Sequence, residues 1–256
     1  MGILESFRLD GKIALVTGAR RGLGQAMAAA LAEAGADVVG LDRTPDYAET
    51  CAMVEETGRR FMHVLCNLET VTVSQLNSIV RDITQQEGHL DILVNNAGIV
   101  RRKQALDYEE SDWDALIQVH LKSVFFLSQA AAKVMVGQGG GKIINIASLL
   151  SFQGGILVPP YAAAKSGVVG LTRALANEWA RMNINVNAIA PGYIETNNTV
   201  ALRADVERNA AILSRIPVGR WGQPDDLKGT AVFLASAASD YMHGATIPVD
   251  GGWLAR

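Results

Sequence analysis

Short apolar runs alternate along the chain with longer segments that have the periodicity of helices. The apolar runs are bounded by turn residues, as buried strands are; they lie at 12–17, 36–42, 61–66 and 90–95, before Ser148, and at 184–189 and 246–249. Helical patterns fill the intervals, notably up to Ala34 and at 46–57, 110–135, 160–181 and 223–237. This alternation predicts an α/β fold of the Rossmann type, a doubly wound parallel sheet of about seven strands with helices on both faces.

The composition is that of one compact soluble domain. The 256 residues contain 49% hydrophobic and 19% charged residues, and no linker, internal repeat or low-complexity segment divides them. We therefore predict a single domain over 1–256. A net charge of −3 without a long basic run argues against a nucleic-acid partner.

Compartment and metal content follow from what the sequence lacks. We find no secretory signal and no apolar run long enough to span a bilayer, so we expect no membrane association. The two cysteines, Cys51 and Cys66, have neither the spacing of metal ligands nor the density of a disulfide framework. We expect reduced thiols, no metal site and a cytoplasmic location.

A glycine-rich turn joins the first predicted strand to the first helix. Gly18, Gly22 and Gly24 stand in the spacing G-x-x-x-G-x-G, with Arg21 and Leu23 between them. Such a turn directs backbone N–H groups and the positive end of a helix to one point, which suits a pyrophosphate. A plain strand-to-helix turn is the alternative.

An acid ends the second predicted strand. Dinucleotide-binding folds place an Asp or Glu ~20 residues beyond the glycines, where it holds the adenosine ribose hydroxyls. Asp42 stands at such a position. Its charge would repel a ribose phosphate and so favours NAD, whereas Arg21 and Arg43 could pair with that phosphate and admit NADP. Alternatively, Asp42 only caps the next helix.

Three polar residues are candidates for catalysis: Ser148 at the end of an apolar strand, and Tyr161 and Lys165 on the helix that follows it. A helix opens at Tyr161, and Lys165 lies four residues later, on the same face. A nearby ammonium would lower the pKa of a tyrosine towards the range of an efficient acid/base, and Ser148 could donate a hydrogen bond to the oxygen on which charge builds. A Tyr–Lys pair at this spacing is also common on helices without any catalytic role.

Together with an Asn95-Asn96-Ala97-Gly98 turn, these motifs resemble the short-chain dehydrogenase/reductase family over essentially the whole chain. The resemblance implies reversible hydride transfer between a secondary alcohol and a nicotinamide cofactor, with Tyr161 as acid/base. The residues that it implies around the cofactor are Gly18, Arg21, Gly22, Leu23, Gly24, Asp42, Asn67, Leu68, Asn95, Ala97, Gly98, Tyr161, Lys165, Pro191, Gly192, Ile194 and Thr196. At 67–68 the family usually has Asp-Leu or Asp-Val on the adenine, so Asn67 is a departure.

A second departure lies at position 120. Members of the family normally have Val-Asn-Leu-Lys where this chain has Val119-His120-Leu121-Lys122, and that asparagine completes a Ser-Tyr-Lys-Asn tetrad with a water-linked proton path. An imidazole can also hold a water and relay protons. His120 is therefore a functional substitute, a packing change with reduced rate, or a sign that catalysis has been lost.

The substrate is indicated by the loops. Arg101-Arg102-Lys103 is either a solvated loop or a cationic rim for a carboxylate, which arginine is well shaped to grip. Gln153, Asn197 and Asn198 are candidate hydroxyl partners, and the polar segment 195–215 is a candidate lid.

The stretches 143–155 and 188–199 and the ending Trp-Leu-Ala-Arg256 resemble a sugar-acid branch of the family. That resemblance implies a keto-deoxy sugar acid such as 2-dehydro-3-deoxy-D-gluconate. The alternatives are gluconate 5-dehydrogenase activity, 3-oxoacyl carrier-protein reductase activity, and a catalytically silent NAD-binding protein. Family members pair the helices corresponding to 110–135 and 160–181, which are rich in Ala and Gly here, so we expect a homotetramer.

Overall fold

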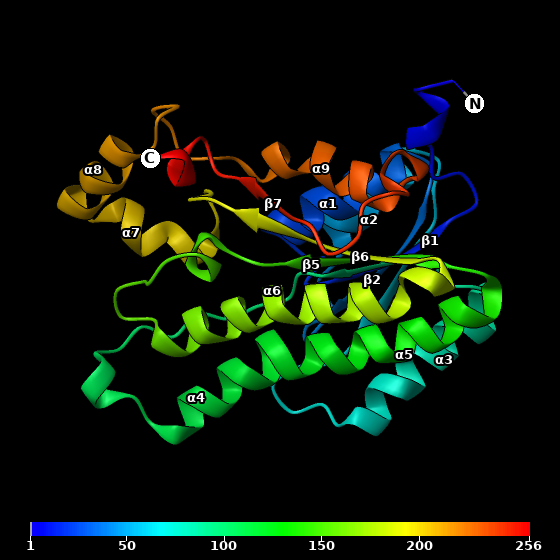
Figure 1. Cartoon of the computed structure of the whole chain (residues 1–256), viewed down its shortest axis with the longest axis horizontal. Helices are drawn as coiled ribbons and strands as arrows, with labels where there is room; N and C mark the ends of the chain where they lie inside the picture. The colour runs from blue at the N-terminus through cyan, green and yellow to red at the C-terminus, as the bar shows by residue number, and fades with distance from the viewer. Residues whose placement is uncertain (1) are drawn as a thin grey trace.

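The computed structural model describes residues 2–256, so only residue 1 of the predicted domain lies outside it. It has one sheet of seven strands, all parallel, in the order β3-β2-β1-β4-β5-β6-β7 (Figure 1). The strands are β1 Ile13–Thr17, β2 Asp37–Asp42, β3 Phe61–Leu65, β4 Ile92–Asn95, β5 Gly141–Ile146, β6 Ile184–Pro191 and β7 Thr246–Val249. The predicted fold class is confirmed.

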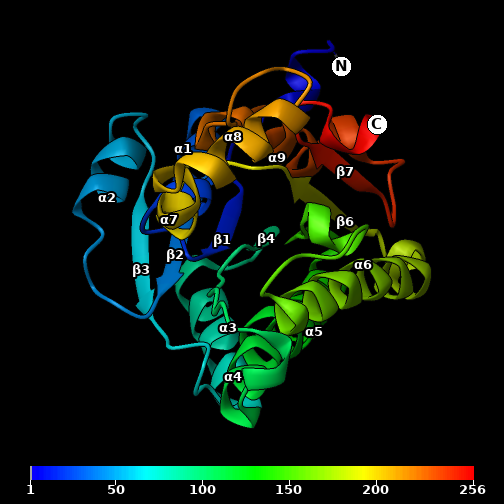
Figure 2. The same ribbon diagram turned by 90° about the vertical axis from the view of Figure 1, so that its left-hand side faces the viewer.

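Helices cover both faces of the sheet, with α1 and α9 on one side and α3, α5 and α6 on the other (Figures 1 and 2). The helices are α1 Gly22–Glu33, α2 Ala48–Glu55, α3 Val73–Glu87, α4 Glu110–Ile117, α5 Ser123–Gln138, α6 Pro159–Trp179, α7 Val200–Ala204, α8 Val206–Arg215 and α9 Lys228–Ala235. On β1, Ala14 and Val16 pack into the core under α1, and Ile13 and Leu15 pack into the core under α3 and α5. Burial on both faces is why these strands are continuous apolar runs.

The predicted long helix at 110–135 is interrupted. A single π-helical turn, Gln118–Lys122, separates α4 from α5. Such turns occur frequently at functional sites. This one carries His120, so the irregularity falls on the residue that departs from the family pattern.

The strand order reverses between β1 and β4: the chain continues from β1 to β2 and β3 on one side, and from β4 to β5, β6 and β7 on the other. In open α/β sheets, a crevice opens at such a point beyond the carboxyl ends of the strands. Figure 2 looks onto this end, where α7 and α8 lie over the strand ends and α4 lies on the opposite side. The fold thus brings the loops after β1, β4, β5 and β6 to one place.

Candidate active site

Two cavities adjoin at the carboxyl ends of the strands. The larger, of about 390 Å³, runs from the glycine turn and Asp42 to His120 and Lys165. The smaller, of about 200 Å³, lies against Ser148 and under α7 and α8. Tyr161 lines both, so any reaction at its hydroxyl takes place where the two cavities meet.

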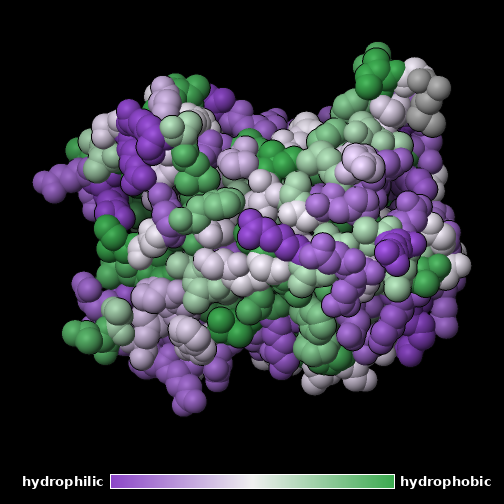
Figure 3. Space-filling model, viewed as in Figure 1, coloured by the Kyte–Doolittle hydropathy of each residue, from purple (hydrophilic) through white to green (hydrophobic). Residues whose placement is uncertain are grey.

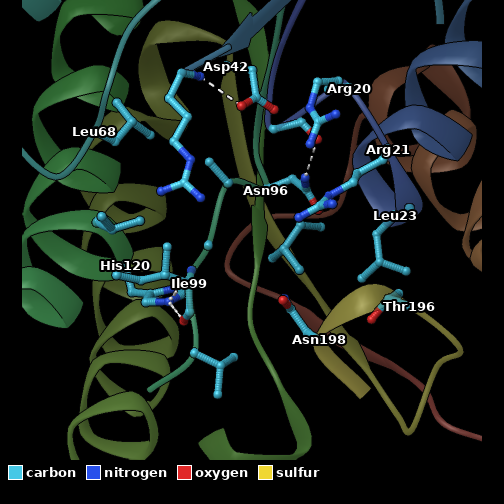
Figure 4. Close-up of a pocket in the computed structure, with 18 of the residues that line it drawn as sticks. Arg20, Arg21, Leu23, Asp42, Leu68, Asn96, Ile99, His120, Thr196 and Asn198 are labelled. Carbon is cyan, nitrogen blue, oxygen red and sulfur yellow. Dashed lines mark hydrogen bonds between the residues drawn. The ribbon is translucent and has the colours of Figure 1, made fainter. Parts of the chain in front are cut away.

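The glycine turn forms one end of the larger cavity (Figure 4). Helix α1 begins at Gly22, so its N-terminal N–H groups lie at the cavity wall. A Cβ on Gly24 would lie 2.1 Å from the carbonyl oxygen of Gly18, so only glycine lets the helix pack this close to the turn. This backbone geometry is the one that an anion cradle requires, and the binding of a pyrophosphate there stays a prediction.

Charges of both signs surround Asp42 at the end of β2. Its Oδ1 accepts a hydrogen bond of 2.7 Å from the backbone N–H of Arg43. The Arg43 guanidinium pairs with Glu69 at 3.2 Å, whereas the structure of residues 2–256 gives no acidic partner to Arg21. Arg21 is thus the cation near Asp42 that is available to a ligand. Asn67 and Leu68 line the same part of the cavity.

The two asparagines at the turn after β4 have different places in the structure. Asn95 is buried, and its amide donates to Ser128 Oγ at 3.0 Å and to Asn145 Oδ1 at 2.9 Å, so it ties β4 to α5 and β5 below the cavity. Asn96 instead lines the cavity and donates to the carbonyl oxygen of Thr17 at 2.9 Å. The structure therefore does not bring the predicted cofactor residue Asn95 to the cavity wall, but it brings Ala97 and Gly98 there.

Ser148 follows β5 and lines the smaller cavity. Its Oγ accepts a hydrogen bond of 3.2 Å from the backbone N–H of Leu150. Because that bond uses a lone pair, the hydroxyl proton remains free to be donated. The Tyr161 phenol lies close enough to Ser148 for a hydrogen bond from the serine to stabilise the phenolate, which acts to lower the pKa of Tyr161.

Tyr161 and Lys165 lie one turn apart near the start of α6, which begins at Pro159, a residue suited to the first turn of a helix. The Lys165 Nζ lies 5.8 Å from the centroid of the Tyr161 ring and donates to the carbonyl oxygen of Ile146 at 2.5 Å. The predicted geometry of the pair is present.

The predicted electrostatics of this pair are not found. Burial raises the pKa of Tyr161, although a hydrogen bond from Ser148 and the charge of Arg102 both act to lower it. Burial also lowers the pKa of Lys165 to about 7. Lys165 is not among the groups that lower the pKa of Tyr161, and a lysine whose own pKa is about 7 carries only part of its charge near neutral pH.

His120 is fully packed beneath the reacting groups. Its Nε2 lies 2.7 Å from the carbonyl oxygen of Ile99, and its ring meets the edge of the Tyr161 ring at 5.0 Å between centroids. A Cβ on Gly98 would lie 2.5 Å from His120 Cε1, so the imidazole fits only beside glycine. Burial, with the Lys165 charge, lowers the pKa of His120 to about 3, and within residues 2–256 its buried Nδ1 has no hydrogen-bond partner.

The segment after β6 closes the site from the other side. Pro191, Gly192 and Ile194 line the smaller cavity, and Thr196 and Asn198 line both cavities. Asn197 lines the larger cavity only. The sequence prediction assigned Pro191, Gly192 and Ile194 to the cofactor and Asn197 to the substrate, so the structure places each of these four in the other cavity, whereas Thr196 and Asn198 lie where the two cavities meet.

The predicted substrate residues separate in the structure. Arg102 lines the smaller cavity and donates to the carbonyl oxygen of Asn198 at 3.0 Å. Arg101 does not line either cavity, because its guanidinium is held by Asp112 at 2.6 Å and Glu69 at 3.1 Å. Gln153 is likewise outside both, and its Oε1 accepts from the Arg215 guanidinium at 3.1 Å.

The similarity of this chain to known proteins extends over nearly its whole length. Residues 18–254 match the family model described as enoyl-(acyl carrier protein) reductase. The 2-dehydro-3-deoxy-D-gluconate 5-dehydrogenase of Escherichia coli (strain K12) is 58% identical over 255 residues, which cover 99% of this chain and 100% of that protein.

The chain belongs to the short-chain dehydrogenase/reductase family.

Two solved structures of this family are close in fold. A structure from Agrobacterium tumefaciens described as a 2-deoxy-D-gluconate 3-dehydrogenase, with bound NADP, is 55% identical with a TM-score of 0.91 over 98% of this chain and 99% of that one. A gluconate 5-dehydrogenase from Burkholderia cenocepacia J2315, in complex with NADP and tartrate, is 42% identical with a TM-score of 0.95 over all of both chains. The dehydrogenase names and the family support an oxidoreductase that acts on CH–OH groups.

The larger cavity fits the nicotinamide dinucleotide that members of a dehydrogenase family use. The residues that would hold it are those at the two ends of the cavity: the α1 N-terminus for the pyrophosphate, Asp42 for the adenosine ribose, and Lys165 and Thr196 for the nicotinamide end. When bound, the cofactor supplies or accepts the hydride.

Several wall residues were not among the predicted site residues. The larger cavity includes Arg20, Asn96 and Glu195, and the smaller includes Tyr193 and Arg208. Asn96 is in the quoted turn and its polarity could have marked it, whereas Arg208 lies in a helix pattern like any exposed cation. In residues 2–256 no helix is long and apolar enough to cross a membrane, and no cluster of metal-ligating side chains is found.

Proposed function

We propose that this protein is an NAD(H)-dependent oxidoreductase that interconverts a secondary alcohol and a ketone on a keto-deoxy sugar acid such as 2-dehydro-3-deoxy-D-gluconate. One observation carries the substrate class. The cavity next to Ser148 and Tyr161 includes the Arg102 guanidinium, and no Asp or Glu of the described residues lines it. A carboxylate with polar hydroxyls fits such a wall, whereas a neutral acyl chain would offer the Arg102 guanidinium no anionic partner.

In the oxidation direction, Tyr161 acts in its phenolate form and accepts the proton of the substrate hydroxyl as the hydride leaves the carbon. Ser148 donates a hydrogen bond to the substrate oxygen and so holds it against the tyrosine. Lys165, whose ammonium and amine forms are both accessible near pH 7, passes the proton onward from the tyrosine side. In the reduction direction the same groups act in reverse.

His120 fits a positioning role in this scheme. Nε2 lies 2.7 Å from the Ile99 carbonyl oxygen and 3.1 Å from the Ile99 backbone N, and the shorter contact favours the tautomer in which Nε2–H donates to the carbonyl oxygen. In that tautomer the Nδ1 lone pair is left as an acceptor in the interior next to Tyr161 and Lys165. That acceptor supports a water on the proton path without any change in the charge of the imidazole.

For the cofactor we propose NAD over NADP. The Asp42 carboxylate lines the cavity at the end of β2, where it would accept from ribose hydroxyls and repel a phosphate. Arg21 and Arg43 line the same region, and the two relatives above bind NADP, so these cations are the residues that would admit it.

We also propose one catalytic domain with a lid at 195–215, working in the cytoplasm as a homotetramer. Cys51 and Cys66 are free, as in a reducing compartment. An apolar groove runs between the π-helical turn, the start of α5 and α6, lined by Leu121, Phe125, Leu171 and Ala174 among others, and apolar residues are visible over these helices in Figure 3. A groove of small and apolar residues suits pairing with a second copy.

The test is a substrate panel with NADH and with NADPH: a keto-deoxy sugar acid, 5-keto-D-gluconate and a 3-oxoacyl thioester. We expect the highest kcat/KM for the keto-deoxy sugar acid with NADH. A thioester that is reduced best would replace the proposal by the acyl reductase. Binding of NADH without turnover of any substrate would indicate a silent NAD-binding protein.

A further inference from the structure

A second arginine, from a different part of the chain, shares the smaller cavity with Arg102. Arg102 belongs to the loop after β4, and Arg208 belongs to α8 in the proposed lid. They are the two charged residues among the described residues that line this cavity. The substrate cavity therefore carries two positive charges and no negative one.

The other arginines of this segment have partners within the protein. Arg203 pairs with Glu195 at 3.2 Å, and the Arg215 guanidinium stacks on the Trp253 ring at 4.2 Å. Over residues 2–256, no ion pair or side-chain hydrogen bond involves the guanidinium of Arg208, which is half-buried. The contrast within one short segment marks Arg208 as the cation that a ligand could engage.

The nearest acid does not neutralise it. Asp205 caps α8, and its Oδ1 accepts from the backbone N–H of Arg208 at 2.9 Å. That carboxylate is thus engaged with the helix N-terminus, where an acid is stabilising in its own right. A guanidinium that is partly removed from water and has no partner favours an anion from solution.

We propose that Arg208 is a second carboxylate-binding residue, which grips the substrate acid group together with Arg102. A carboxylate has two oxygens with lone pairs for about four hydrogen bonds, enough for two guanidinium groups. The inference deepens the proposed function and rests on it for the identity of the acid. It adds that specificity for acids comes from the lid as well as from the sheet side of the cavity.

A consequence is that the substrate itself would hold the lid. Arg208 lies on α8 and Arg102 lies on the loop after β4, so one carboxylate bound to both would bridge the two walls of the cavity. Arg102 already contacts the base of the lid through the Asn198 carbonyl oxygen at 3.0 Å. A neutral sugar would lack this bridge.

The experiment compares Arg208→Gln, Arg208→Lys and a matched control, Arg181→Gln, which removes one exposed cation remote from the cavity. Each is assayed with a keto-deoxy sugar acid and with the amide of the same acid. Arg208→Gln should lower kcat/KM for the acid roughly 10- to 100-fold and for the amide less than about 3-fold. Arg208→Lys should recover part of the loss, and Arg181→Gln should change neither substrate.

Binding separates this proposal from the proposed function. D-gluconate and neutral sorbitol are titrated by calorimetry into the NADH complexes of the parent and Arg208→Gln proteins. Weaker binding of gluconate alone in the variant supports Arg208 even if no sugar acid is turned over. Equal losses for acid and amide, or unchanged binding of gluconate, would overturn the role of Arg208 while leaving the proposed function intact.

Discussion

The two cavities at the carboxyl ends of the strands are built in different ways. The larger is lined by turns that follow the strands directly, and these turns bond to the ends of neighbouring strands: the Gly18 N–H donates to the Leu41 carbonyl oxygen of β2 at 2.7 Å, and the Asn96 N–H donates to Thr17 Oγ1 of β1 at 2.9 Å. The smaller is lined mostly by longer loops and by α7 and α8. The wall of the cofactor cavity is thus positioned by hydrogen bonds to the sheet. The wall of the substrate cavity is positioned by contacts between loops and helices that are distant in sequence.

Their charges differ as well. The larger cavity mixes Arg20, Arg21 and Arg43 with Asp42 and Glu69, whereas the smaller contains arginine alone. A mixed wall suits a ligand with both phosphates and hydroxyls, and a cationic wall suits an acid. One scaffold therefore keeps the hydride chemistry constant while the second cavity selects the substrate.

The largest effect should come from Tyr161, whose hydroxyl is the proposed acid/base and whose side chain lines both cavities. Tyr161→Phe removes the exchangeable proton and retains the ring, so kcat should fall by at least about 100-fold. NADH binding, measured by fluorescence titration, should stay within about 3-fold of the parent because the ring still packs against both cavities. Turnover near that of the parent protein would remove Tyr161 from the mechanism.

The buried Lys165 on the cofactor side makes the stability of the folded protein depend on pH. Its pKa is about 7 in the folded protein and about 10.4 in an unfolded chain, so between these values the unfolded state binds more protons. The stability that this residue contributes therefore rises as pH rises from about 7 to about 10, and is lowest below 7.

Lys165→Met removes this penalty. The variant should be inactive yet more stable than the parent near pH 7, by on the order of 2–4 kcal/mol, with the difference shrinking towards pH 10. Urea unfolding at several pH values measures this. A difference that does not vary with pH would mean that Lys165 is not buried as an ionisable group in the folded protein.

Asp42→Ala should alter the larger cavity alone. Loss of the carboxylate removes the repulsion of a ribose phosphate while Arg21 and Arg43 remain, so the ratio of kcat/KM for NADH to that for NADPH should fall by roughly 10-fold. The KM for the sugar acid should not move. A parent enzyme that already prefers NADPH would contradict the role given to Asp42.

The smallest effect is expected at His120. Since burial lowers the pKa of His120 to about 3, the imidazole is neutral over the working range, and a titration limb near pH 6 to 7 is not expected. The kcat profiles of the parent and His120→Asn proteins should therefore run parallel from about pH 5 to 8. A limb near 6.5 in the parent profile alone would show that the imidazole titrates during turnover.

The division between the cavities also explains how far the sequence could be interpreted. The glycine turn, Asp42 and the Tyr161–Lys165 pair are set by local spacing next to strand ends, so their positions could be predicted. The engagement of Arg101 depends on Asp112 and Glu69, which local patterns do not connect. The π-helical turn at His120 and the approach of Arg208 to the cavity are likewise products of tertiary packing.

The binding of an acid in the smaller cavity is tested most directly by comparing two neighbouring arginines in one assay. Arg102 lines the substrate cavity and Arg101 is held by two acids outside it, so Arg101→Gln is a natural control for Arg102→Gln. The quantity measured is the ratio of kcat/KM for a keto-deoxy sugar acid to that for its amide. We predict that Arg102→Gln lowers this ratio roughly 10-fold or more and that Arg101→Gln leaves it within about 3-fold of the parent. Equal ratios in the parent and Arg102→Gln proteins would contradict the assignment of this cavity to an acid.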